Sequence, residues 1–196
     1  MNMTIKKPNL THSLCFMFSG KAGTGKSWAS DYAQKFCDEA GLKTFKAPLA
    51  RGVKETATFM GWDGKKDEKG RVLLQEIGKA GRSYDQSLWS RSAFNHIEEQ
   101  VGFPFDVVFI DDWRFKDEYD YVMKNQPLYK VVSVRMVAPI RESLIGKPSY
   151  YDESETALDG IVIPDMSYVS NDPECLSTGV GIEAIIGRAF IRYSLV

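Results

Sequence analysis

The sequence has few of the residues that stabilise disulfide-rich domains or bind metals in pairs. Among 196 residues there are three cysteines and two histidines. Cys15, Cys37 and Cys175 are widely spaced and odd in number, which suits a reducing compartment better than a disulfide framework. No two of them have the spacing of a metal-binding pair. We therefore expect a cytoplasmic protein that folds without disulfides.

Long apolar runs and an excess of charge of one sign are also missing. The short apolar stretch that follows Lys6 and Lys7 leads directly into a glycine-rich motif, so we interpret it as a core strand and not as a signal peptide or a membrane span. The net charge is −1. This balance argues against a nucleic-acid polymer or a membrane as the main partner, although it permits a local basic pocket.

The clearest motif is the phosphate loop, Gly20 to Ser27, whose sequence GKAGTGKS satisfies the pattern G-x-x-x-x-G-K-[ST]. An apolar run, Leu14 to Phe18, predicts a strand before it, and apolar residues at helical spacing predict a helix after it. Glycines let the backbone approach phosphate oxygens, and the helix start adds its positive dipole end. We predict that ATP binds here, on Gly20, Lys21, Ala22, Gly23, Thr24, Gly25, Lys26, Ser27 and the adjacent Trp28.

The rest of the chain alternates predicted strands with predicted helices, as in an α/β protein. The helix after the phosphate loop should end at Gly41, and a helix should close the chain at 182–193. A helical insert of about 51–103, broken by the polar loop Asp63 to Gly70, separates two of the strands. The strands after the first are expected at 43–47, 106–112, 128–137 and 166–170.

Four polar and small residues of the insert share one helical face. Arg71, Gln75, Gly78 and Arg82 fall at i, i+4, i+7 and i+11. Guanidinium groups bind phosphate through two parallel bonds, and an amide can pair with a donor and an acceptor of a base edge together. This face could therefore hold a nucleotide, but a solvated helix face would show the same pattern, and both interpretations stay open.

Charged residues also follow two of the predicted strands, at the edge where ligands of open α/β sheets gather. Arg51 or Lys54 could face a substrate or could begin a solvated helix. Asp111 and Asp112 close an apolar strand in the manner of a Walker B segment, which helps to hold Mg²⁺, although an aspartate can also cap the next helix. Arg114 lies on the turn that follows, so we expect it to face the ligand edge.

Residues 138–164, the lid segment, are polar and lack sustained periodicity. Lids that close over phosphates need arginines, because closure expels water and the charge must then be neutralised by fixed donors. Arg135 and Arg141 are the candidates. Surface salt bridges are the alternative for both.

Taken in order, five blocks of this sequence resemble the bacteriophage deoxynucleoside monophosphate kinase family. The phosphate loop is specific only for its superfamily, whereas the Leu-Gln-x-x-Gly block with its arginines and the following Asp-x-Arg-Phe point to this family. The blocks are Gly20 to Ser27; Ala47-Pro48-Leu49; Arg71 to Gly78 with Arg82; Asp112-Trp113-Arg114-Phe115 with Glu118; and Ser154 to Asp159.

The resemblance implies a P-loop fold in a single domain, 1–196, with a parallel five-stranded sheet and helices on both faces. Its core would be 13–50 and 104–196, with the helical insert bearing the substrate site and an arginine-bearing lid. The implied reaction transfers the γ-phosphoryl group of ATP, with Mg²⁺, to the 5′-phosphate of a deoxynucleoside monophosphate. If the chain is viral, the host cytoplasm would be its location, and a homodimer stays open.

The resemblance also implies roles for individual residues. The catalytic group would be Lys26, Arg82, Arg114, Arg135 and Arg141. Ser27 and Asp112 would hold Mg²⁺ or its waters. The acceptor would be bound by Lys46, Arg51, Arg71, Gln75, Arg82, Trp89, Asp112, Arg114 and Glu155.

Three other functions are compatible with a phosphate loop. A nucleoside kinase would need a carboxylate base for a neutral hydroxyl, and Glu76 is the one candidate on the arginine-bearing helix. A phosphomevalonate-type kinase would use a similar arginine-rich site. A nucleotide-dependent switch would phosphorylate nothing, but the Asn-Lys-x-Asp motif of guanine-specific switches is absent from the sequence.

Overall fold

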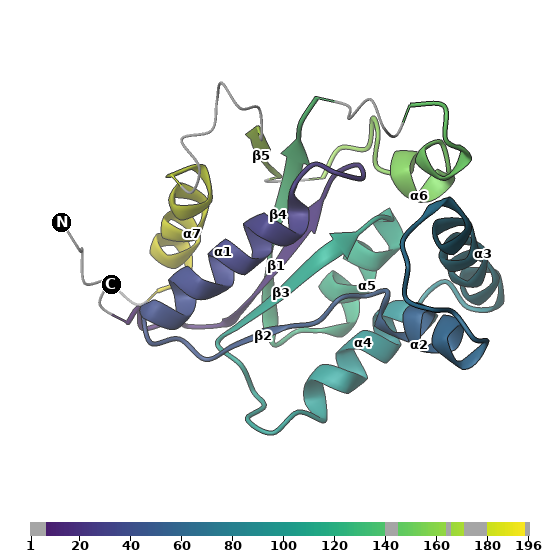
Figure 1. Cartoon of the computed structure of the whole chain (residues 1–196). Coiled ribbons are helices and arrows are strands. Elements are labelled where there is room, and N and C mark those ends of the chain that lie inside the picture. Colours follow the sequence, from purple (N-terminus) through teal and green to yellow (C-terminus); the bar gives the residue numbers. More distant parts are fainter. Residues whose placement is uncertain (1–6, 140–144, 164–165, 171–179, 195–196) are drawn as a thin grey trace.

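The computed structural model describes residues 7–139, 145–163, 166–170 and 180–194. Five parallel strands form one sheet in the order β2-β3-β1-β4-β5 (Figure 1). This arrangement confirms the predicted α/β class and the parallel five-stranded sheet. The strands are β1 (Ser13–Ser19), β2 (Thr44–Lys46), β3 (Val107–Trp113), β4 (Tyr129–Val137) and β5 (Ser167–Ser170).

Helices cover both faces of this sheet, with α1 and α7 on one face and α4 and α5 on the other (Figure 1). Between β2 and β3 the described chain forms helices only, as the sequence predicts for the insert. The helices are α1 (Lys26–Glu39), α2 (Arg51–Phe59), α3 (Glu68–Tyr84), α4 (Leu88–Glu98), α5 (Lys116–Asn125), α6 (Glu153–Thr156) and α7 (Val180–Tyr193), with a 3₁₀ turn at Pro148–Tyr150.

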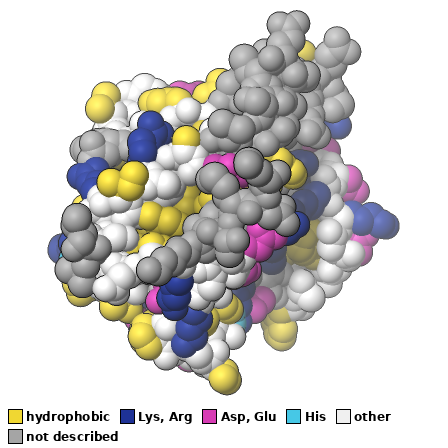
Figure 2. Space-filling view, turned by 90° about the vertical axis from the view of Figure 1, so that its left-hand side faces the viewer, with side chains coloured by type: hydrophobic (Ala, Val, Ile, Leu, Met, Phe, Trp, Pro, Cys, Tyr) yellow, Lys and Arg dark blue, Asp and Glu magenta, His cyan; other side chains and the backbone are white. Residues whose placement is uncertain are grey.

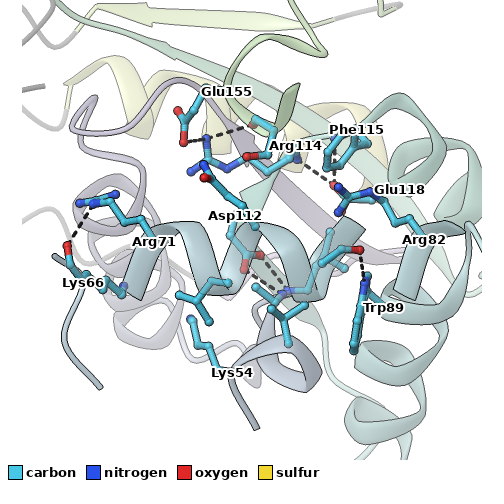
Figure 3. A pocket seen from close by; sticks show the side chains of 17 residues that line it. Lys54, Lys66, Arg71, Arg82, Trp89, Asp112, Arg114, Phe115, Glu118 and Glu155 are labelled. Atoms are coloured by element: carbon cyan, nitrogen blue, oxygen red, sulfur yellow. Dashed lines mark hydrogen bonds and ion pairs between the residues drawn. The ribbon is translucent and has the colours of Figure 1, made fainter. Parts of the chain in front are cut away.

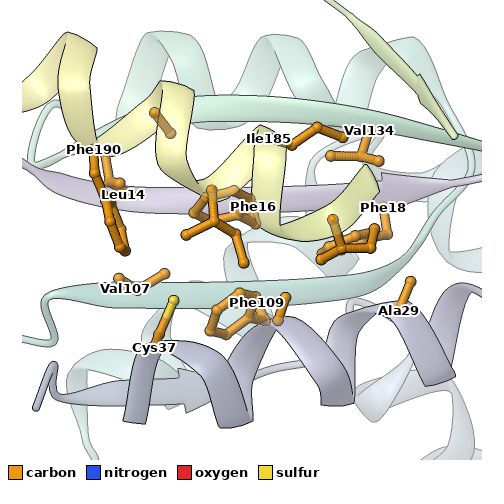
Figure 4. Close-up of a cluster of buried hydrophobic side chains, with 14 of the residues drawn as sticks. Leu14, Phe16, Phe18, Ala29, Cys37, Val107, Phe109, Val134, Ile185 and Phe190 are labelled. Atoms are coloured by element: carbon orange, nitrogen blue, oxygen red, sulfur yellow. The ribbon is translucent and has the colours of Figure 1, made fainter. Parts of the chain in front are cut away.

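The central strand β1 is apolar on both sides because both faces of the sheet are covered. Leu14, Phe16 and Phe18 pack in the cluster under α1 and α7 (Figure 4). Cys15 and Met17 point to the opposite cluster, which includes residues of α4 and α5. The carboxyl end of β1, where the phosphate loop begins, is thereby anchored in a close-packed core.

Two local signals explain where helix α1 ends and where helix α3 begins. Gly41 takes a positive φ of 76° and its N–H donates to the carbonyl of Asp38, which ends α1 as predicted. The polar loop of the insert is shorter than the sequence predicts. Asp67 caps α3 by accepting the N–H of Gly70 at 2.8 Å, so this helix begins at Glu68, inside the expected loop.

The topology opens a crevice at the carboxyl ends of β1 and β3. After β1 the chain continues into α1 on one face of the sheet, and after β3 it continues into α5 on the other face. The two connections therefore leave the carboxyl ends of these neighbouring strands in opposite directions. Ligands of open α/β sheets bind at such a switch point. Figure 1 shows that α3 and α6 lie together at this end of the sheet.

On the face shown in Figure 2, hydrophobic, basic and acidic side chains are interspersed. Among the helices of the described residues, none has both the length and the apolar composition needed to cross a bilayer.

Candidate functional site

The phosphate loop lies between β1 and α1 and depends on glycine. Gly20 has a φ of 141°, and a Cβ added there would lie 2.5 Å from the carbonyl oxygen of Met136 and 2.7 Å from Oγ1 of Thr24. Gly25 occupies the N-cap position of α1 with a φ of 87° and offers no side chain to the amides of the first turn. Those amides and the dipole end of α1 suit an anion. The chain has a P-loop α/β fold.

Lys26 is folded into the loop. Its Nζ donates to the carbonyl oxygens of Gly20 at 2.6 Å and Lys21 at 2.9 Å, and the residue is only 8% exposed. Burial, followed by the positive charge of Arg114, lowers the pKa of Lys26 to about 7. A phosphate beside Nζ would favour the charged form again.

This pKa predicts a proton linkage for nucleotide binding. Above pH 7 the free Lys26 is increasingly neutral, whereas the complex needs an ammonium, so binding takes up a fraction of a proton that grows with pH. The apparent Kd for the magnesium complex of ADP should rise by close to tenfold per pH unit above about pH 7.5. Calorimetric titrations in two buffers of different ionisation enthalpy should show proton uptake approaching one at about pH 8.5. A pH-independent Kd with no uptake would contradict the prediction.

Asp111 lies beside Ser27. The hydroxyl of Ser27 is close enough to lower the pKa of the Asp111 carboxyl, and Nζ of Lys46 lies 3.0 Å from Oδ2 of Asp111. Burial alone would raise the pKa of Asp111, but the hydrogen bond and charge of Lys46 hold it below its ordinary value. Lys46 also contacts Asp31 at 2.6 Å.

Asp112 points elsewhere, to the start of the insert. Its Oδ1 accepts the N–H of Leu49 at 2.7 Å and its Oδ2 accepts the N–H of Ala50 at 3.0 Å. Burial, followed by the negative charge of Asp111, raises its pKa. Both oxygens therefore hold the turn that leads into α2.

The donor set beside the phosphate loop fits Mg²⁺. This ion prefers oxygen ligands and is bound through one or two protein groups together with substrate phosphates. Ser27 supplies a hydroxyl and Asp111 an ionised carboxylate. Within the described residues no cluster of three or more His, Cys, Asp or Glu side chains could hold a metal by itself.

A cavity of about 210 Å³ lies beside the phosphate loop, between the insert and α6 (Figure 3), and is called the pocket below. Arg71, Gln75, Gly78 and Arg82 all line it, so the stripe predicted on one helical face forms one wall. The full lining is Leu49, Ala50, Val53, Lys54, Lys66, Arg71, Leu74, Gln75, Gly78, Arg82, Trp89, Asp112, Arg114, Phe115, Glu118, Ser154 and Glu155.

One side of the pocket combines a cation, an aromatic ring and a buried acid. The guanidinium carbon of Arg82 lies 3.8 Å from the ring centroid of Phe115. Oε2 of Glu118 accepts the N–H groups of Arg114 at 2.8 Å and Phe115 at 3.0 Å. Burial raises the pKa of Glu118 to about 7. Trp89 is held against α3 by a 2.9 Å bond from its Nε1 to the carbonyl of Gly78.

Arg114 connects the pocket with the phosphate loop. Its Nη1 lies 2.8 Å from Oε1 of Glu155, 3.3 Å from the carbonyl of Ser154 and 3.4 Å from the carbonyl of Gly20. The other oxygen of Glu155 accepts the N–H of Ala22 at 2.6 Å. Loop, arginine and carboxylate are thus one contiguous network, of which Figure 3 shows Arg114 and Glu155.

Arg135 lies at the phosphate loop but comes from β4. It pairs with Ser19 in the sheet register, and its Nη2 contacts Oδ1 of Asp159 at 2.7 Å. Asp159 also binds Nζ of Lys21 at 3.0 Å. Arg135 is therefore tied to the loop through a shared carboxylate of the lid segment.

The described part of the lid segment is docked on α3. Glu68 accepts the N–H of Ser149 at 2.8 Å and its hydroxyl at 2.7 Å. Gln75 donates from Nε2 to the carbonyl of Ser149 at 2.7 Å. The sequence analysis expects the Gln75 amide to pair with the edge of a base. In the structure this amide is instead bound to the lid segment.

Several predicted residues lie away from the pocket. Arg51 pairs along α2 with Glu55 at 2.8 Å, and Lys46 is held by the two aspartates described above. Trp28 is 43% exposed and stacks on Tyr32. Arg141 lies outside the described residues.

Three other pocket residues have no role, or only an open one, in the sequence-based predictions. Lys66 belongs to a polar loop without periodicity, so no local signal marks it. The sequence left open whether Arg51 or Lys54 faces a substrate. Of these two residues, Lys54 lines the pocket. Glu118 appears only within a family block, although its acid side chain lines the cavity.

No protein-family model matches the sequence. A protein of Ictalurid herpesvirus 1 (strain Auburn), called uncharacterized protein ORF77, is 32% identical over 143 residues, which are 72% of this chain. The chain spans 58% of the length of that viral relative.

Solved structures similar to the chain include two kinases. An APS kinase from Mycobacterium tuberculosis, in complex with AMPPNP and APS, is 10% identical with a TM-score of 0.44, over 90% of this chain and 98% of that one. A gluconokinase from Sinorhizobium meliloti 1021 is 12% identical with a TM-score of 0.43, over 95% of this chain and 98% of that one.

Proposed function

We propose that this protein is an ATP-dependent kinase that phosphorylates the 5′-phosphate of a deoxynucleoside monophosphate. The observation that carries the proposal is the position of Arg114, whose guanidinium reaches both a carbonyl of the phosphate loop and the pocket. A group held by this arginine would lie next to the terminal phosphate of a nucleotide in the loop. Such a site is suited to phosphoryl transfer.

The chemistry needs positioning and charge neutralisation. An acceptor phosphate is already anionic, so no strong general base has to remove a proton from it. Lys26 and the loop amides would hold the phosphates of ATP, while Arg82 and Arg114 would hold the acceptor phosphate. Arg135 would neutralise charge from the β4 side, and Arg141 keeps the lid role that the resemblance implies.

Mg²⁺ would be held by Ser27 and Asp111. Bound Mg²⁺ would neutralise charge on the β- and γ-phosphates. We assign the carboxylate ligand to Asp111 rather than to Asp112, because Asp111 contacts Ser27 whereas both oxygens of Asp112 accept backbone amides. Lys46, by pairing with Asp111, would keep that carboxylate ionised and oriented.

The acids of the pocket argue against a neutral hydroxyl acceptor. Glu76, the candidate base of a nucleoside kinase, is exposed and does not line the cavity. The acids that do line the described pocket, Asp112, Glu118 and Glu155, each already accept backbone N–H groups. A phosphate acceptor fits these residues better.

A nucleotide acceptor is supported by the apolar part of the pocket. Leu49, Val53 and Leu74 lie with the aromatic Trp89 in the lining, and such surfaces suit the flat face of a base. The arginines at the loop side would hold its phosphate.

A phosphorylated carboxylic acid, as in a phosphomevalonate-type kinase, is the second candidate. Lys66 and Arg71 lie at the end of the pocket away from Arg82 along α3 (Figure 3), and Lys54 lines it as well. These cations could hold a second anionic group, and the docking of Gln75 on Ser149 removes one expected base contact.

Initial rates of ADP release separate these functions. The assay offers ATP and Mg²⁺ with deoxynucleoside monophosphates, the matching ribonucleotides, nucleosides and phosphomevalonate. We expect release with one or more deoxynucleoside monophosphates and none with nucleosides. Release with phosphomevalonate alone would establish the second candidate, and release with nucleosides alone or with no acceptor would contradict both.

We further propose that the protein acts in the cytoplasm, that of the host if the chain is viral, without a nucleic-acid polymer or a membrane as partner. The near-neutral net charge of −1 supports this. A homodimer is compatible with the proposal.

A further inference from the structure

We infer that Glu155 is an internal anion that occupies the γ-phosphate end of the phosphate loop and holds Arg114 until ATP displaces it. This inference rests on the proposed function. It makes Glu155 a positioning residue that couples ATP binding to the availability of an acceptor-binding arginine.

The two oxygens of Glu155 serve two different elements. Oε2 accepts the N–H of Ala22 in the phosphate loop at 2.6 Å, and Oε1 lies 2.8 Å from Nη1 of Arg114. The side chain is 5% exposed, so water does little to screen these contacts. A carboxylate on a loop amide makes the type of bond that a phosphate oxygen makes there.

The position of the Glu155 carboxylate indicates that it takes the place of the γ-phosphate of ATP. In the proposed reaction the transferring group lies between the phosphate loop and the acceptor that Arg114 holds. Glu155 contacts both the phosphate loop and Arg114 directly, so it lies between the loop and the arginine proposed to hold the acceptor. Nζ of Lys26 meanwhile donates to the carbonyls of Gly20 and Lys21 in the same loop.

Arrival of a γ-phosphate would change these contacts. Two anions repel each other and cannot both accept the Ala22 N–H at short range, so Glu155 must leave it. Arg114 would then exchange the carboxylate for phosphate oxygens of ATP and acceptor, for which its planar guanidinium is suited. ADP lacks the γ-phosphate and would disturb Glu155 much less.

The test measures binding in the absence of turnover. In Glu155→Gln the amide oxygen can still accept from Ala22, but the negative charge is gone. The Kd of the magnesium complex of adenylyl-imidodiphosphate should fall by about tenfold, while the Kd of Mg-ADP should change by less than about twofold. Glu153→Gln, the same change at an exposed acid of the same helix, should alter neither value.

Other outcomes overturn the inference. Equal changes for the two nucleotides would show that Glu155 acts on the loop in general, and weaker binding of the ATP analogue would make Glu155 a nucleotide-binding group. No change in either Kd would remove it from the site. Each of these results can occur with a fully active kinase, so failure here is distinct from failure of the proposed function, which the acceptor assay tests.

Discussion

Arg114→Ala should lower kcat by about three orders of magnitude while the protein stays folded. The side chain contacts the carbonyl of Gly20 and the carboxylate of Glu155, so it lies where charge must be neutralised during transfer. It is 23% exposed, and its removal leaves no large cavity in the apolar core. Initial rates with ATP and the active acceptor measure the loss, and thermal unfolding followed by circular dichroism verifies the fold.

Matched variants define what this loss means. Arg91→Ala removes a guanidinium that pairs with Asp85 at 2.7 Å on the insert surface, and it should change kcat by less than about twofold. Arg82→Ala should reduce turnover in the same direction as Arg114→Ala, because Arg82 lines the same pocket. Near-normal rates for Arg114→Ala would remove this residue from the catalytic group.

Asp111→Asn should lower kcat by about 10²-fold to 10³-fold and raise the Mg²⁺ concentration needed for half-maximal rate. The asparagine keeps the size of the side chain and can still bond to Ser27, but it has lost the charge that attracts the ion. Rates measured over a series of Mg²⁺ concentrations report both effects. Retention of the wild-type Mg²⁺ requirement would contradict the assignment.

Asp112→Asn is the matched comparison at the neighbouring position. Its amide group would face one of the two N–H donors of Leu49 and Ala50, which leaves a buried donor without an acceptor. We expect a loss of about 1–3 kcal/mol in unfolding free energy and a higher KM for the acceptor, with the Mg²⁺ requirement unchanged. If this variant alone shifts the Mg²⁺ requirement, Asp112 holds the metal, as the family resemblance implies.

The sequence determined the parts of this site that are contiguous or periodic. The phosphate loop is one unbroken segment, and its strand and helix follow from apolar runs whose burial needs no knowledge of distant partners. The stripe from Arg71 to Arg82 could be predicted because helical spacing alone puts those residues on one face. The sequence therefore predicts which residues of α3 form this wall of the pocket.

Contacts between distant elements could not be predicted in this way. Asp111 and Asp112 are adjacent on β3, and successive strand residues point to opposite sides, but no local pattern tells which one meets Ser27. The pairing of β2 with β3 brings Lys46 to Asp111, although the resemblance places Lys46 among acceptor-binding residues. The order of the strands, which puts β3 between β2 and β1, therefore decided which of these side chains meets the phosphate loop.

The bond between Ala22 and Glu155 spans 133 positions of the chain. Neither residue has an unusual local pattern, because a loop alanine and a helix glutamate are common everywhere. The docking of the lid segment on α3 through Ser149, together with the contacts of Asp159 to Lys21 and Arg135, places α6 beside the phosphate loop. Residue types and local periodicity thus determined the P-loop fold and the pocket wall, whereas tertiary packing decided which carboxylates reach the loop, since electrostatic contacts depend on distance in space and not along the chain.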